Sequence, residues 1–178
     1  SQDEVDAFFT EIRKRTGKQD QSETEIQFLQ DFRELSQSDD GQEFYMVNLL
    51  KFRKKALYPL GSSFSDDPMA ANKRYNLAIG PQLIMHGSFP VFASTVMGRF
   101  IHPENADDWD QVAMVRHRSR RDMLKMVVDM AGKGIDIHKW AALEKTQVFP
   151  VKSFLNLFLV RITVALFLFG LGALILAF

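Results

Sequence analysis

Five polar side chains in the middle of the chain have the chemistry of a small-molecule site: Asn48, Tyr75, His86, Arg116 and His117. His117 could act as a general base, because the reference pKa of imidazole, about 6.5, suits proton transfer at neutral pH. In an extended segment its side chain lies on the opposite face from Arg116, its neighbour in the sequence. The alternative is a half-buried histidine that merely hydrogen-bonds to a neighbour.

Asn48 alternates in phase with apolar residues, so its amide needs a partner, either a ligand or nearby backbone. An unpaired buried amide costs about 1 to 3 kcal/mol. Tyr75 and His86 lie in one helical segment and share a face only if the helix bends at Gly80 and Pro81. Because these side chains form no convergent set, the sequence indicates no catalytic site.

The four histidines, His86, His102, His117 and His138, form no HxH, HExxH or HxxxH pair, and the chain has no cysteine. We therefore expect no zinc or iron site, no disulfide and no cysteine nucleophile. No glycine-rich phosphate loop, GxSxG motif or haem-attachment motif occurs, so we expect no cofactor. The basic run RHRSRR, residues 116–121, lacks interleaved aromatic residues, which argues against a nucleic-acid partner.

The elements that must position these side chains follow from apolar periodicity and from glycine and proline. Two amphipathic helices are expected in an N-terminal arm, residues 1–40, where 11 acidic side chains outnumber 5 basic ones. This arm either stays a solvated surface or docks on the basic remainder of the chain or on a partner.

After the arm we expect a strand, a helix, two strands, a helix and a strand, at residues 43–53, 69–86, 89–101, 109–118, 119–131 and 140–151. This β-α-β-β-α-β order predicts an α+β, ferredoxin-like domain over residues 41–151. Its four-stranded antiparallel sheet would be covered by two helices on one face.

Four stretches of this domain are similar to segments of a known family: MVNLLKFR, the helical segment with Tyr75, Pro81 and Gly87, WDQVAMVRHRSRRDMLKMVVD, and HKWAALEKTQVFPV. With them the domain resembles an uncharacterised bacterial family of the dimeric α+β barrel superfamily. The resemblance implies a homodimer with two sheets packed face to face, and a sheet face without helices independently requires a cover. The superfamily includes cofactor-free monooxygenases, haem-handling enzymes and dehydratases, so it implies no single reaction.

The apolar segment 154–178 is expected to form a transmembrane helix. Residues 162–178 carry no charge and would span roughly 25 Å as a helix. Basic residues precede this segment and none follows it, so the positive-inside rule places the preceding domain on the cytoplasmic side. Residues 152–178 would thus be a single-pass, tail-type membrane anchor.

Two features of the expected anchor point to a partner in the membrane. Arg161 either snorkels to the lipid headgroups or pairs with a partner. The small residues Thr163, Gly170, Ala173 and Ala177 share one helical face, which permits close helix packing. Arg161 and this face are therefore the expected contact with a membrane partner.

Two functions are consistent with these features. The first is a membrane-anchored, homodimeric accessory, assembly or interaction subunit of a larger membrane protein complex, with membrane lipid and integral membrane proteins as partners. The alternative is a membrane-tethered enzyme or small-molecule binder that resembles cofactor-free monooxygenases and takes a lipophilic or quinone-type ligand. The first is favoured because the unusual residues lie outside the central domain, which lacks a convergent catalytic set.

Overall fold

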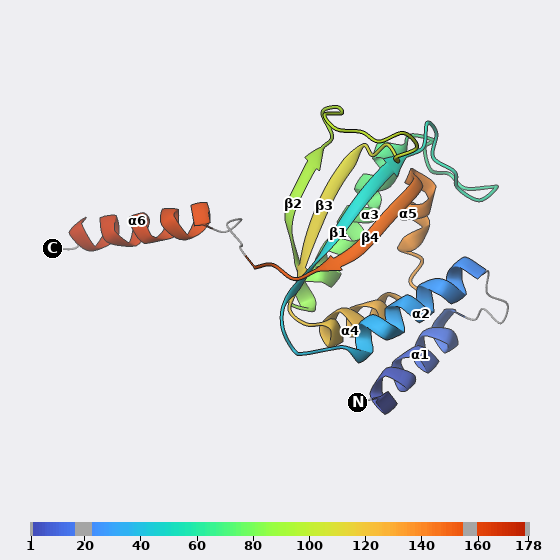
Figure 1. Ribbon diagram of the computed structural model, residues 1–178, viewed down its shortest axis with the longest axis horizontal. Coiled ribbons are helices and arrows are strands. Elements are labelled where there is room, and N and C mark those ends of the chain that lie inside the picture. The colour runs from blue at the N-terminus through green and yellow to red at the C-terminus, as the bar shows by residue number, and fades with distance from the viewer. Residues whose placement is uncertain (1, 17–22, 155–159, 177–178) are drawn as a thin grey trace.

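The computed structural model describes residues 2–16, 23–154 and 160–176, which contain one four-stranded antiparallel sheet and six helices (Figure 1). The chain therefore belongs to the α+β class, as predicted. In chain order the elements are α1 (Gln2–Thr16), α2 (Glu23–Gln37), β1 (Phe44–Phe52), α3 (Pro68–Met85), β2 (Phe89–Thr95), β3 (Gln111–His117), α4 (Arg120–Met130), α5 (Asp136–Ala142), β4 (Leu143–Val151) and α6 (Val160–Leu176).

β1 occupies a central position in the sheet, whose strand order is β2-β3-β1-β4. It pairs antiparallel with β3 on one side and with β4 on the other. Its sequence, FYMVNLLKF, is apolar on both faces, which is typical of a strand inside a sheet. The register sets Val47 opposite Met114 of β3 and Phe149 of β4, so these three side chains lie in one row on the same face.

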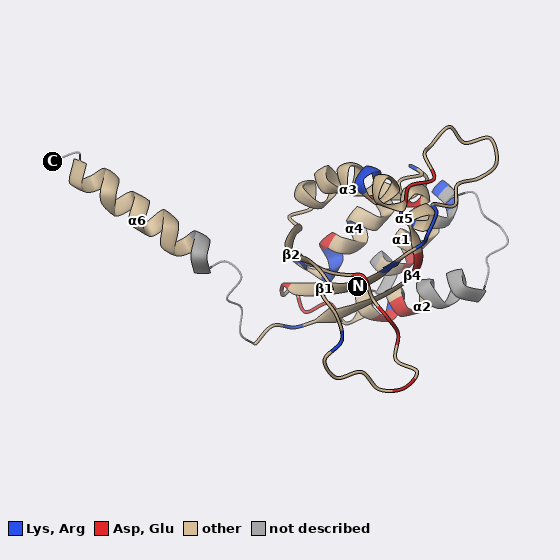
Figure 2. Ribbon diagram, turned by 90° about the horizontal axis from the view of Figure 1, so that it is seen from above, with Lys and Arg blue, Asp and Glu red and all other residues tan. Residues whose placement is uncertain are grey.

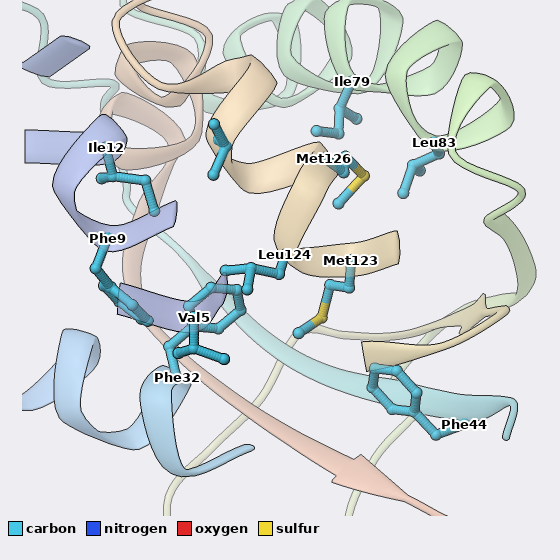
Figure 3. Close-up of a cluster of buried hydrophobic side chains, with 11 residues drawn as sticks. Val5, Phe9, Ile12, Phe32, Phe44, Ile79, Leu83, Met123, Leu124 and Met126 are labelled. Carbon is cyan, nitrogen blue, oxygen red and sulfur yellow. The ribbon is translucent and has the colours of Figure 1, made fainter. Parts of the chain in front are cut away.

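Helices α3, α4 and α5 lie together on one side of the sheet (Figure 2). A cluster that we call the main core fills the space between these helices and β1. Leu124 of α4 is 1% exposed and packs there with Ile79 and Leu83 of α3 and with Phe44 of β1 (Figure 3). Burying an apolar side chain of this size contributes about 1.5 to 3 kcal/mol, so the main core holds the helix layer on the sheet.

The N-terminal arm is folded onto the rest of the chain. Apolar side chains of α1 and α2 belong to the main core, and the rings of Phe9 and Phe32 meet edge to face with centroids 5.9 Å apart (Figure 3). Arg15 of α1 donates from Nη1 to the carbonyl oxygen of Val128 in α4 at 2.9 Å. The acidic arm therefore docks on the domain, both through these apolar contacts and through ion pairs of Asp40 with Arg120 and Lys152.

α3 begins with a capped first turn, close to residue 69 where the sequence places its start. The Asp67 carboxylate accepts a hydrogen bond from the amide of Met69 at 2.9 Å, and Pro68 occupies the first turn. The helix continues through Pro81 to Met85 as one element rather than as two pieces. Proline lacks the amide proton that would bond one turn back, but Ile79 and Leu83 on either side of it are anchored in the main core.

α5 was not predicted as a helix. Residues 140–142, expected to open the last strand, form its last turn, and β4 begins at Leu143. Ala141 and Ala142 are 1% and 0% exposed and pack with Ala71 of α3 in a second core. These small side chains let α5 lie close to α3, and this tertiary contact overrides the local preference for a strand.

None of the described helices is long and apolar enough to cross a membrane. α6 has 17 residues, which at about 1.5 Å per residue rise roughly 25 Å, short of a hydrocarbon core of about 30 Å. The predicted transmembrane anchor, the single-pass membrane location and the membrane-anchored subunit are therefore wrong, as is the membrane tethering of the alternative enzyme. The prediction of lipid and integral membrane partners rested on this anchor and loses its support.

Gly132 provides a test of the docked arm. Its φ is +79°, and a Cβ added there would lie 2.7 Å from the carbonyl oxygen of Arg15 in α1. Gly134 has a φ of +68° but nothing within 4 Å of an added Cβ. We expect Gly134→Ala to lower the free energy of unfolding by about 1 kcal/mol, the cost of a left-handed backbone alone. Gly132→Ala should cost at least about 2 kcal/mol because α1 must also move.

Urea denaturation of the two variants measures this difference. Equal losses in both variants would show that α1 does not press against Gly132.

Candidate functional site

The face of the sheet opposite α3, α4 and α5 carries apolar side chains that these helices do not cover; we call it the outer face. Its central row crosses all four strands and is wholly apolar: Phe92, Met114, Val47 and Phe149. Phe92 and Phe149 are 38% and 37% exposed. An apolar row of this kind, open to water across a whole sheet, is typical of an interaction surface.

The next row of the outer face mixes apolar and small polar residues. Leu49 and Val112 lie side by side at its centre, with Ser94 of β2 and Gln147 of β4 at its ends. The apolar surface is therefore widest on β1 and β3 and narrows toward the edge strands.

An ion pair borders the outer face at the end where β1 begins. Arg116 donates from Nη2 to Glu43 Oε2 at 2.7 Å and from Nη1 to the carbonyl oxygen of Gly87 at 3.3 Å. Its guanidinium also lies over the ring of Phe89, 5.2 Å from the centroid. Arg116 was predicted to line a small-molecule site, and the structure places it on this rim.

A second group of ion pairs borders the opposite end. Lys51 donates to Asp110 Oδ1 at 2.9 Å, and this hydrogen bond raises the pKa of Lys51. Lys145 of β4 forms an ion pair with Asp107. Both acids belong to the loop between β2 and β3, so the loop is tied to this end of the outer face. An apolar centre inside a charged rim is the anatomy of a protein–protein interface.

The same loop, residues 96–110, presents apolar side chains to solvent. Met97, Phe100 and Ile101 are 101%, 99% and 84% exposed, and they border a cleft of about 550 Å³ that Lys51 and Trp109 also line. Side chains of this size are rarely left so exposed together in a monomer. The loop therefore extends the apolar surface beyond the sheet.

The other predicted site residues lie on the helix side or at helix ends. Asn48 donates from Nδ2 to the carbonyl oxygen of Met46 at 3.1 Å, the backbone alternative for its amide. Tyr75 of α3 packs against the main core, and burial raises its pKa to about 12. His86 caps α3, with Nε2 3.2 Å from Asp129 Oδ2 of α4.

His117 is 4% exposed at the end of β3. Its Nδ1 lies 2.9 Å from Oγ of Ser88, and its ring stacks on Phe44 with centroids 5.2 Å apart. Burial, and then the charge of Arg116, lower the pKa of His117 to about 4. The imidazole is therefore neutral at pH 7 and enclosed by protein, which is the structural alternative rather than an accessible general base.

Ser88 was not predicted, although it is 0% exposed and is the partner of His117. A single serine between a glycine and a strand has no spacing that marks it. None of the five predicted side chains hydrogen-bonds to another, so the structure does not assemble them into one site. Within the described ranges no group of three His, Asp or Glu side chains could hold a metal ion.

The residues predicted to contact a membrane partner lie on or beside α6. Thr163, Gly170 and Ala173 are exposed on this helix. The side chain of Arg161 and the whole of Ala177 fall outside the part of the chain that the structure describes.

Comparisons with known proteins establish the fold alone. No family model and no curated protein matches the chain. A crystal structure of a protein of unknown function from Rhodopseudomonas palustris aligns at a TM-score of 0.63 and 22% identity, covering 77% of this chain and 97% of that one. The methylated form of that protein aligns at a TM-score of 0.63 and 23% identity, covering 79% of this chain and 98% of that one. The predicted bacterial family with an added transmembrane helix is wrong, because no described helix is long and apolar enough to span a membrane, and the structural neighbours show the fold alone.

The buried imidazole of His117 makes the stability of the fold depend on pH. Its folded pKa of about 4 lies below the unfolded value of about 6.5, so the unfolded chain binds the proton first. The free energy of unfolding should fall as the pH drops below about 6.5 and level off near pH 4, a loss of about 3 kcal/mol from this group.

His117→Asn keeps an acceptor near the Nδ1 position and should flatten this dependence, whatever its effect at pH 7. His102→Asn, in an exposed loop, is the control and should keep the wild-type dependence. Denaturant unfolding from pH 4 to 7.5 measures how the free energy of unfolding depends on pH. The same dependence in His117→Asn as in the wild type would show that His117 is not its source.

Proposed function

We propose that the chain functions as a homodimer in which the outer faces of two copies pack against each other. The observation that carries this proposal is the continuous apolar row formed by Phe92, Met114, Val47 and Phe149, on the face that α3, α4 and α5 do not cover. Removing such a row from water contributes about 25 cal/mol for each Å² of apolar surface buried. A second sheet of the same shape is the partner that covers all four strands at once.

The charges around the outer face favour a second copy of this chain over a partner of one dominant charge. Each end of the rim pairs its own basic and acidic side chains: Arg116 with Glu43, and Lys51 with Asp110. The rim therefore presents no strong field of a single sign. When two identical surfaces meet across a two-fold axis, such a rim causes little repulsion, whereas a rim of one sign would oppose itself.

The topology supports the same arrangement. The strand order β2-β3-β1-β4, with α3 and α4 as the two connecting helices, agrees with the split βαβ, ferredoxin-like fold. In this fold both helices lie on one face, so the free face is available for a second sheet. We propose that two copies form a dimeric α+β barrel, with α1, α2 and α5 as additions to the basic unit.

The biochemical role that follows is that of an interaction protein. Self-association hides the apolar face and the exposed loop, and it presents two copies of the helix layer to the surroundings. No reaction is proposed, since the predicted site residues are dispersed.

Light scattering on the full chain tests the homodimer. We expect a mass of twice the 20.4 kDa of the chain at micromolar concentration. Met114→Lys puts a charge in the middle of the apolar row of both copies, and we expect it to weaken association at least about 100-fold, because like charges would face each other. In the monomer the added ammonium reaches water, so the variant should melt only as far below the wild type as loss of the dimer requires, near the temperature of wild-type chain diluted until it dissociates.

Leu77→Lys is the matched control. Leu77 is 67% exposed on α3, away from the outer face, and this variant should remain a dimer. A wild-type monomer would contradict the proposal. So would a dimer that survives Met114→Lys, for example one held together by the exposed apolar side chains of α6.

A further inference from the structure

A group of aromatic and cationic side chains lies where α3 meets α5, on the helix side of the sheet and away from the proposed dimer surface. The 53–67 loop, which joins β1 to α3, contributes two of its rings. We call it the aromatic–cationic cluster: Tyr58, Phe64, Arg74, Tyr75, His138, Lys139 and Trp140. None of the roles described above uses it.

Arg74 of α3 holds a positive charge without an acidic partner. Its guanidinium lies over the ring of Phe64, 5.1 Å from the centroid, and its Nη1 is buried with no hydrogen-bond partner. A buried donor left unpaired costs about 1 to 3 kcal/mol, more when it is charged. An unpaired buried group of this kind calls for an explanation, and a partner that binds from outside the chain is one.

Lys139 of α5 is in a similar position. Its ammonium lies 5.9 Å from the centroid of the Tyr75 ring and 5.5 Å from that of Trp140. Burial lowers the pKa of Lys139. The nearby Asp136 contributes to the raised pKa of Tyr75 but forms no ion pair with Lys139. Among the described residues, no carboxylate pairs with either Lys139 or Arg74.

Ring contacts place the two cations on the same α3–α5 interface. Phe64, which lies under Arg74, meets the His138 ring edge to face with centroids 5.0 Å apart. His138 precedes Lys139 in α5 and is held by a 2.9 Å hydrogen bond between its Nδ1 and the Tyr58 hydroxyl. Tyr75 follows Arg74 in α3 and lies beneath Lys139. A chain of ring contacts through His138 therefore links the pair Arg74–Phe64 to α5, the helix that carries Lys139.

The cluster also has an exposed aromatic edge. Phe64 is 45% exposed and Trp140 is 54% exposed. A flat apolar body can stack on these rings while an acidic group reaches the cations behind them. Two cations, unpaired donors and aromatic walls are complementary to a carboxylate attached to an aromatic ring; a guanidinium presents its donors in the plane that a carboxylate matches.

We propose that the aromatic–cationic cluster is a binding site for a small aromatic carboxylate, with the carboxylate between Arg74 and Lys139 and the ring against Phe64 and Trp140. The ligand supplies the hydrogen bonds that Arg74 lacks. The aromatic walls select it over a bare anion such as phosphate. This site does not depend on the homodimer, because its residues belong to the helix side of each copy.

Tryptophan fluorescence measures binding directly. The chain has two tryptophans, and Trp109→Phe leaves Trp140 as the sole emitter in the otherwise complete chain. We expect benzoate to change its emission saturably, with inorganic phosphate and the neutral analogue benzamide at least about 10-fold weaker. Equal binding of phosphate or benzamide would overturn the assignment to an aromatic carboxylate.

Charge-removing variants then locate the site. Arg74→Gln and Lys139→Gln, each made in the Trp109→Phe chain, should weaken benzoate binding at least about 10-fold, the loss expected for one charge-assisted hydrogen bond. Lys73→Gln removes an exposed charge from the adjacent position on α3 and should leave affinity unchanged.

The stability of Arg74→Gln provides a second readout. Because the substitution removes an unpaired buried donor, this variant should melt no lower than its parent without ligand, but it should lose the stabilisation that benzoate gives. No response to benzoate at millimolar concentration, or affinity unaffected by both variants, would overturn the proposal.

Discussion

β1 carries apolar side chains on both of its faces, and the rest of the structure is organised around this constraint. On one face Phe44 and Met46 enter the main core, and Leu50 and Phe52 pack against the second core. On the other face Val47 and Leu49 lie at the centre of the outer face. The helix layer satisfies the first face only, so the second requires a cover that one copy of the described chain does not supply.

The helix side is itself divided between two cores, and α3 spans both. Its C-terminal half contributes Ile79 and Leu83 to the main core, and its first turns bring Ala71 against Ala141 and Ala142 of α5. Alanines at this contact allow the two helices to approach closely. The same approach brings Arg74 and Lys139 against aromatic rings. Asp136 of α5 is close enough to raise the pKa of Tyr75, but it forms no ion pair with either cation.

The charged groups on the rim of the outer face and those between α3 and α5 are held in different ways. Those on the rim of the outer face, such as Lys51 with Asp110, are paired within the chain and remain half in water, where each pair contributes little to stability. Arg74 and Lys139 lie against ring faces instead. Away from water an unpaired charge lowers stability more than it would at the surface, and a bound anion would stabilise the charge more. The paired rim is consistent with the proposed self-association, and the unpaired cations with the proposed ligand.

Local patterns in the sequence determined the kinds of elements and their order. The apolar run of β1, the Asp67–Pro68 start of α3 and the Ser119 cap of α4 all depend on near neighbours in the sequence. The alternation of side chains along an extended segment also placed His117 and Arg116 on opposite faces of β3. Two predictions were wrong. Residues 140–142 form the last turn of α5 rather than a strand, because Ala141 and Ala142 meet α3, which is distant in sequence. α6 is too short for the membrane span predicted from its composition.

Only the tertiary structure decided which side chains are paired and which are not. The partner of His117 is Ser88, 29 residues away, and the aromatic support of Arg74 comes from a loop that no periodicity describes. The sequence predicts which side chains are buried, because apolar character belongs to each side chain and its pattern to its near neighbours. Which group meets which is set by long-range packing. The sequence therefore predicted that a sheet face needs a cover, whereas the aromatic–cationic cluster appears only in the folded chain.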